Sequence, residues 1–254
     1  MIIAVYILVA LFGLSLGSFL NVVIYRLPKG YSIVSPRSFC PNCRRQLPWY
    51  ENIPVFSYIF LKGRCRGCGA KISIQYPLIE LLGALTAIGV FAVYDISIDA
   101  FFVFLFLMAL IAVTLIDWRY RIIPDQISLP FILLGIGWSL LSPARSPSSA
   151  ALGALLGGGG LFLIGYLYKL IRHVDGMGGG DVKLMAMIGA FLGVRMLLPV
   201  ILIASLTGSV YGIYLMRKGG DAKSMVAFGS FLAPAAAICL FFGEQFLRYY
   251  FARF

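Results

Sequence analysis

Hydrophobic residues occur along this chain in long uninterrupted blocks that are separated by short polar segments. A helix that crosses a bilayer needs about 20 mostly apolar residues, and most of the blocks approach that length. The first block is too long for a cleavable signal and ends in polar residues, so we expect it to be a helix of the folded protein. The pattern predicts an all-α polytopic membrane protein with about eight transmembrane helices, at 2–25, 77–94, 100–116, 127–142, 151–170, 182–194, 196–216 and 228–250.

The composition supports a membrane protein. Of the 254 residues, 61% are hydrophobic and only 12% are charged, whereas soluble domains are nearer one half and one quarter. A single soluble domain is therefore excluded. The 28 glycines follow no three-residue repeat, which excludes a collagen-like chain. Within the fifth block, Gly157–Gly160 are expected to allow close packing between helices; a functional hinge is the alternative.

The distribution of basic residues predicts the orientation in the membrane. The net charge is +11, and 17 of the 21 Lys and Arg residues lie in or beside alternate loops, at 26–76, 117–126, 171–183 and 217–227. Cytoplasmic loops are enriched in these residues. We therefore expect this set of loops in the cytoplasm and both termini outside. The positive charge then reflects topology and contact with the lipid bilayer, and it does not indicate nucleic-acid binding.

Four cysteines in the longest polar loop form two pairs. The pairs have the CxxC pattern, with 21 residues between them, and two such turns can complete a tetrahedral zinc site. Four sulfur ligands leave no position for water, so we expect structural zinc; a redox dithiol or an iron–sulfur cluster is the alternative. Cys239 is expected to be a buried apolar residue. The predicted ligands are Cys40, Cys43, Cys65 and Cys68.

These features predict three parts of the chain. Residues 1–25 form the first transmembrane helix, 26–76 a small cytoplasmic zinc-binding domain, and 77–254 a membrane domain. The membrane domain contains the acidic residues of most interest. Most other acids are expected to be solvated, and Glu80 to pair with a base of the cytoplasmic domain. The acids expected to be solvated are Glu51, Asp95, Asp99, Asp175, Asp221 and Glu244.

Two aspartates are predicted at the same depth, at the cytoplasmic edge of the membrane. Asp117 ends the third block, and Asp181 follows three glycines and opens the sixth. A carboxylate at this boundary is costly and indicates function. Two close carboxylates share a proton, so that one activates a water and the other polarises a carbonyl, as in aspartic proteases. This chemistry needs neither a metal nor a cofactor.

Each acid also has a structural explanation. Asp117 could pair with Arg119 or Arg121, and Asp125 and Asp181 could cap helices. Other activities also remain open, because intramembrane aspartates occur in transporters and channels, and the cysteine loop alone could be a binding module. Serine and cysteine proteolysis is disfavoured because the chain has only one histidine, and the HExxH motif of zinc proteases is absent.

Several motifs resemble the type IV prepilin peptidase family. The most specific are an Asp-x6-Pro element, matched by Asp117 and Pro124, and a Gly-x-Gly-Asp element, matched by 178–181. Two positions depart from the family pattern: Ser230 stands where FGPF would have proline, and Gln75 where an arginine commonly precedes Tyr-Pro. The matching segments are GSFLNVVIYRLP (17–28), CPNC (40–43), 47–72, YPLIELL (76–82), LIDWRYRIIPD (115–125) and GMGGGDVKLMAMIGAFLG (176–193).

The resemblance implies an aspartic endopeptidase of the inner membrane, with Asp117 and Asp181 as catalytic residues. Such enzymes remove the basic leader of type IV prepilins and pseudopilins at the cytoplasmic face. Members with four cysteines typically also methylate the new N-terminus with S-adenosylmethionine, for which no binding residues are identified. Substrate binding is expected at Gly178, Gly180 and Lys183, although Lys183 could simply extend toward the lipid headgroups. The particular substrates and the oligomeric state are not determined by the sequence.

Overall fold

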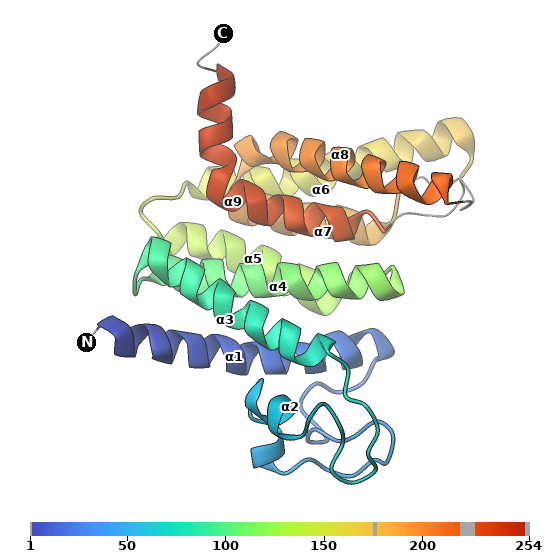
Figure 1. The fold of residues 1–254 in the computed structure, drawn as a ribbon. Helices are drawn as coiled ribbons and strands as arrows, with labels where there is room; N and C mark the ends of the chain where they lie inside the picture. Colours follow the sequence, from blue (N-terminus) through green and yellow to red (C-terminus); the bar gives the residue numbers. More distant parts are fainter. Residues whose placement is uncertain (1, 175–176, 219–226, 252–254) are drawn as a thin grey trace. The chain divides into compact units, whose positions relative to one another are not determined.

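A computed structural model describes residues 2–174, 177–218 and 227–251. Within these ranges the chain is helical, without strands, apart from two isolated β-bridges in the polar loop. Asp175 and Asp221 lie outside the described residues. The helices are α1 Ile2–Arg26, α2 Phe56–Phe60, α3 Gln75–Tyr94, α4 Ile98–Tyr120, α5 Asp125–Leu141, α6 Pro147–Arg172, α7 Gly179–Leu192, α8 Leu197–Arg217 and α9 Gly229–Phe251, with 3-10 turns η1 Leu27–Lys29, η2 Trp49–Glu51 and η3 Val194–Met196 (Figure 1).

The membrane class predicted from the apolar blocks is confirmed. Six described helices, α1, α3, α4, α6, α8 and α9, are long and apolar enough to cross a membrane. The count of eight spans is not confirmed. Helix α5 has 17 residues and α7 only 14. At about 1.5 Å per residue, α7 extends only about 21 Å, which is less than a bilayer core of about 30 Å.

The chain forms two compact units, residues 1–108 and 109–254. In the first unit, α1 packs along α3, and glycines allow their backbones to meet. A Cβ atom on Gly13 would lie 2.5 Å from the carbonyl oxygen of Gly83, and one on Gly17 would lie 2.7 Å from the Cα of Glu80. Small residues four apart are a common basis of close helix packing in membranes. The polar loop between α1 and α3 holds α2 and the four cysteines.

The second unit uses glycines in the same way to join α6 and α7, which lie side by side in Figure 1. A Cβ on Gly153 would lie 2.2 Å from the carbonyl oxygen of Gly189, and one on Gly157 would lie 2.7 Å from that of Met185. Gly158 also faces α7, whereas Gly160 meets open space. The expectation of close packing at Gly157–Gly160 is therefore confirmed for the first half of that run.

Helix α7 is the buried centre of the second unit. It contacts α5, α6, α8 and α9, and Met185, Ile188 and Phe191 are fully enclosed. A helix that is mostly apolar on all sides is buried, either among other helices or in lipid, and the contacts of α7 show that it lies among helices. This packing fixes the position of α7, and with it the position of Asp181 in its first turn.

Candidate functional site

The first feature of the site is the buried carboxylate of Asp117, near the end of α4. The residue is 5% exposed. Its Oδ2 accepts a hydrogen bond from the backbone N–H of Ser230, at 2.7 Å, and a second from the Ser230 hydroxyl, at 3.0 Å. The hydroxyl also lies 3.3 Å from the carbonyl oxygen of Thr114. Residues 113 positions apart in the sequence therefore meet where α9 begins.

Asp181 reaches the same helix terminus from α7. The backbone N–H of Gly229 donates toward its carboxylate, and Asp117 is close enough for its charge to act on Asp181. Two consecutive N–H groups at the start of α9 thus donate to the two aspartates, that of Gly229 to Asp181 and that of Ser230 to Asp117. A helix N-terminus favours negative charge because its first N–H groups have no partner within the helix. The two acids that the sequence singled out are brought together within one unit.

Ile123 lies between the beginnings of α7 and α9. A Cβ added at Gly180 would come within 3.0 Å of the Ile123 Cβ, and one at Gly229 within 2.6 Å of its Cδ1. The Gly229 Cβ would also lie 2.9 Å from Oδ2 of Asp117. A larger residue at Gly229 would therefore displace Ile123 or the carboxylate, whereas one at Gly180 would need only a small shift of Ile123.

Of the three residues expected to bind substrate, Gly178 is beside the acid pair. A Cβ on Gly178 would be 3.5 Å from Oδ2 of Asp181. Lys183 forms an ion pair with Asp125, with Nζ–Oδ distances of 2.7 and 2.8 Å. The capping role considered for Asp125 is wrong, because α5 follows Pro124 without a side-chain cap. Lys183 and Asp125 are 58 positions apart in the sequence, and no sequence pattern indicated that they would form an ion pair.

The second feature is the cysteine cluster in the first unit. Sγ of Cys40 lies 3.9 Å from Sγ of Cys68, and Sγ of Cys43 lies 4.0 Å from Sγ of Cys65. All four ligand atoms lie within 4.8 Å of one another. Zinc–sulfur bonds of about 2.3 Å in a tetrahedron place sulfur atoms about 3.8 Å apart. The four cysteines can therefore hold a metal ion, and their spacing fits zinc.

The two CxxC turns have the same backbone pattern. In the first, Cys40 donates its N–H to Arg45 and accepts at its carbonyl oxygen from Arg44; in the second, Cys65 does the same with Ala70 and Gly69. Gly69 has φ of +69° and Arg44 has φ of +57°. The left-handed conformation at the end of each turn closes it and directs two sulfur atoms to one point. An arginine occupies this conformation with more strain than glycine.

Hydrogen bonds favour the thiolate form of two of the four cysteines, Cys65 and Cys68. The Asn42 side-chain amide donates to Sγ of Cys68 at 3.5 Å and lowers the pKa of the Cys68 thiol to about 6. The pKa of Cys65 is lowered by backbone N–H groups, that of Cys68 first and then that of Gly67. Metal ligands must be deprotonated thiolates, so these donors favour metal binding through Cys65 and Cys68. An Arg45 backbone hydrogen bond acts to lower the pKa of Cys43, but burial and the neighbouring thiols raise it to about 11. Cys239 of the second unit is buried, as expected.

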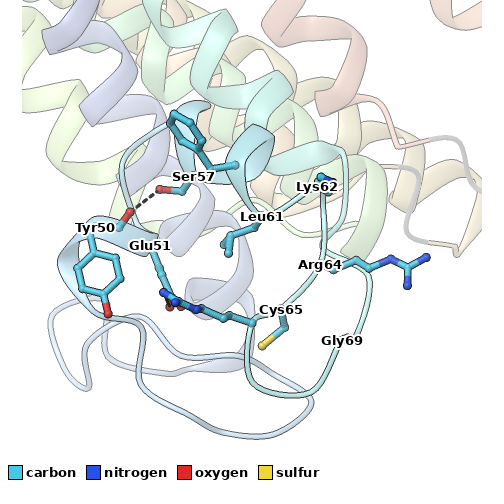
Figure 2. A pocket seen from close by; sticks show the side chains of 10 residues that line it. Tyr50, Glu51, Ser57, Leu61, Lys62, Arg64, Cys65 and Gly69 are labelled. Carbon is cyan, nitrogen blue, oxygen red and sulfur yellow. Dashed lines mark hydrogen bonds and ion pairs between the residues drawn. The ribbon is translucent and has the colours of Figure 1, made fainter.

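Glu51, expected to be solvated, is 7% exposed and supports the cluster. Its carboxylate pairs with both terminal nitrogens of Arg45, at 2.8 and 3.1 Å. Arg45 lies in the chain between the first CxxC turn and η2, so this ion pair holds Cys40 and Cys43 against the rest of the loop. Beside it is an open hollow of about 630 Å³ (Figure 2), lined by Tyr50, Leu61, Lys62, Arg64 and Cys65 among others.

Glu80 connects α3 to the same loop. Its Oε2 accepts a hydrogen bond from the backbone N–H of Val55 at 2.7 Å. Val55 has φ of +62° and ψ of −50°, a strained conformation for a β-branched residue. The expectation that Glu80 pairs with a base is wrong. The partner is a backbone amide that the sequence pattern could not identify.

The fold and these two features define an integral-membrane protein with a four-cysteine metal-binding cluster and a buried aspartate pair. Two family models match the chain: the bacterial peptidase A24 N-terminal domain at residues 11–94, and the type IV leader peptidase family at 104–213. The chain belongs to the type IV leader peptidase family.

Curated relatives are similar over nearly the whole chain. A prepilin leader peptidase/N-methyltransferase of Aeromonas salmonicida is 38% identical over 96% of this chain and 92% of the relative. Proteins of the same name from Burkholderia pseudomallei and Pseudomonas aeruginosa are 38% and 36% identical, over 92% and 94% of this chain and 84% and 91% of the relatives. No solved structure matches.

Proposed function

We propose that this protein is a membrane aspartic endopeptidase that cleaves the basic leader from type IV prepilins or pseudopilins. The observation that carries the proposal is the convergence of Asp117 and Asp181 on the first residues of α9, in a chain of the type IV leader peptidase family. The family membership supports a peptidase and does not support the transporter considered from the sequence.

Two adjacent carboxylates that share one proton can hydrolyse a peptide bond. The ionised member takes a proton from a water molecule as the water oxygen attacks the scissile carbonyl carbon. The protonated member gives its proton to the carbonyl oxygen. When the C–N bond breaks, one carboxyl group gives its proton to the leaving nitrogen. A hydroxyl of the tetrahedral diol then gives a proton back to the other carboxylate. The pair is restored without any metal or cofactor in this reaction.

The membrane setting fits a prepilin as substrate. The apolar helix of a pilin lies within the bilayer and its basic leader in the cytoplasm, so the scissile bond falls at the membrane boundary, at the depth proposed for Asp117 and Asp181. We propose an inner-membrane location with the cysteine loop and both aspartates on the cytoplasmic side and both termini outside, on the distribution of basic residues. Gly178, Gly180 and Lys183 remain proposed substrate contacts.

A second activity, N-methylation of the new N-terminus, is supported by the names of the relatives. S-adenosylmethionine supplies the methyl group in that reaction. We assign no described residue to its binding. Cys40, Cys43, Cys65 and Cys68 would hold structural zinc, since their sulfur atoms already lie at nearly tetrahedral spacing.

The test is cleavage of a co-purified prepilin by the full-length protein in detergent. Asp117→Asn and Asp181→Asn each keep the side-chain shape but remove a carboxylate, and each should abolish cleavage while the protein still accumulates. Asp95→Asn is the matched control: Asp95 is exposed and accepts a hydrogen bond within its own turn, from the N–H of Ile96. Normal cleavage by either of the first two variants would refute the proposed function.

A further inference from the structure

Ser230 gives Asp117 two hydrogen-bond donors that a proline could not supply. The chain has serine at the position where the FGPF pattern has proline, and proline has neither a backbone N–H nor a hydroxyl. Both Ser230 donors reach the same oxygen, Oδ2 of Asp117, at 2.7 and 3.0 Å. Ser230 is 5% exposed, so its two donors are enclosed together with the carboxylate that they contact.

The donors are unequally divided between the two acids. Asp117 receives the N–H and the O–H of Ser230, whereas Asp181 faces the backbone N–H of Gly229. Hydrogen bonds to a carboxylate favour its ionised form, and a neighbouring negative charge favours protonation of the other acid. Two donors on one carboxylate therefore favour Asp117 as the ionised member of the pair.

We infer that Ser230 is a positioning residue that holds Asp117 as the ionised base of the pair, with Asp181 as the acid. This inference rests on the proposed peptidase function. In the reaction, Asp117 takes one proton from water while the water oxygen bonds to the carbonyl carbon, and Asp181 gives its proton to the carbonyl oxygen. When the C–N bond breaks, Asp117 gives its proton to the leaving nitrogen, and a hydroxyl of the diol returns one to Asp181.

Ser230 also directs the Asp117 carboxylate. With Oδ2 held by two donors, Oδ1 is the oxygen left to face a water molecule. The Thr114 carbonyl oxygen, 3.3 Å from the serine hydroxyl, is a second acceptor for its single proton, and the shorter contact of 3.0 Å is the one to the charged Asp117 carboxylate. The arrangement fixes the base before substrate binds, and such preorganisation lowers the barrier of the chemical step without strengthening binding.

The experiment compares Ser230 variants in the prepilin cleavage assay. Ser230→Ala removes the hydroxyl and keeps the N–H. A hydrogen bond to a charged group contributes about 1.5–3 kcal/mol, so we expect kcat to fall about 10-fold or more with KM unchanged. Ser230→Thr keeps both donors and should restore at least half of kcat. Ser230→Cys, with a weak donor of similar size, should be intermediate and covers the case in which the alanine variant does not accumulate.

Ser139→Ala is the matched control, because Ser139 is a buried serine of α5 whose hydroxyl bonds to a helix carbonyl oxygen. It should keep wild-type kcat and KM. The inference is overturned if Ser230→Ala and Ser230→Cys keep wild-type kcat, if they raise KM instead, or if Ser230→Thr is as impaired as Ser230→Ala. Each of these results leaves the proposed function intact so long as Asp117→Asn is inactive. Normal cleavage by Asp117→Asn refutes the function itself.

Discussion

The contact between Gly153 of α6 and Gly189 of α7 predicts a large effect from one methyl group. In Gly153→Ala the new Cβ would lie 2.2 Å from the carbonyl oxygen of Gly189 and 2.9 Å from its carbon. Both atoms belong to backbone inside a helix, so they cannot rotate away. Ordinary contact begins near 3.4 Å, so the two helices must separate by about 1 Å. Overpacking of this kind costs about 1–3 kcal/mol.

The displacement should reach the acid pair. Asp181 lies eight residues before Gly189 on the same helix, and a packed helix moves as a rigid element. A shift of about 1 Å in a catalytic group can reduce the rate about 100-fold. We therefore expect Gly153→Ala to lower the melting temperature and to reduce prepilin cleavage by about 10- to 100-fold.

Gly160→Ala is the control for this prediction. Gly160 lies on the same helix, but its Cβ would meet no atom within 4 Å. Its helix propensity should improve by at most about 1 kcal/mol, and its cleavage rate should match the wild type. Thermal unfolding in detergent and initial cleavage rates measure both variants. Equal stability and activity of the two variants would refute the reasoning.

Three further predictions follow from the site. Gly229→Ala places a Cβ 2.9 Å from Oδ2 of Asp117; cleavage should drop at least about 10-fold with normal accumulation, and wild-type kinetics would contradict this. Cys68→Ser should release bound zinc, as measured by metal analysis, and impair methylation more than cleavage; full zinc retention would count against the cluster. Asp125→Asn breaks an exposed ion pair with Lys183 and should lower stability by less than about 1 kcal/mol in thermal unfolding, so a loss above about 2 kcal/mol would show that the pair is stronger than its exposure implies.

Local patterns in the sequence were sufficient for the membrane class and the cysteine cluster, and they led to the proposal of the two aspartates. Long apolar blocks require helices in lipid because every backbone polar group must be satisfied within its own segment. A CxxC turn directs two sulfur atoms to one point through residues only three apart. Such features depend on neighbours in the chain, and they can be identified before the fold is known.

Contacts between distant segments were decided only by the tertiary structure. The burial of Glu51 against Arg45, the Val55 amide that holds Glu80, and the pairing of Lys183 with Asp125 left no periodic signal. The number of spans was also uncertain from hydropathy, because a short helix surrounded by other helices is as apolar as one that faces lipid.

The clearest example is the start of α9. Its sequence, Phe228-Gly229-Ser230-Phe231, reads as an ordinary beginning of an apolar helix. The fold places its N–H groups against Asp117 and Asp181, because the packing of α7 and α9 brings three separate helices to one point. The sequence determined which acids were unusual, and only the folded chain decided which donors meet them, because a hydrogen bond depends on distance in space and not on position in the chain.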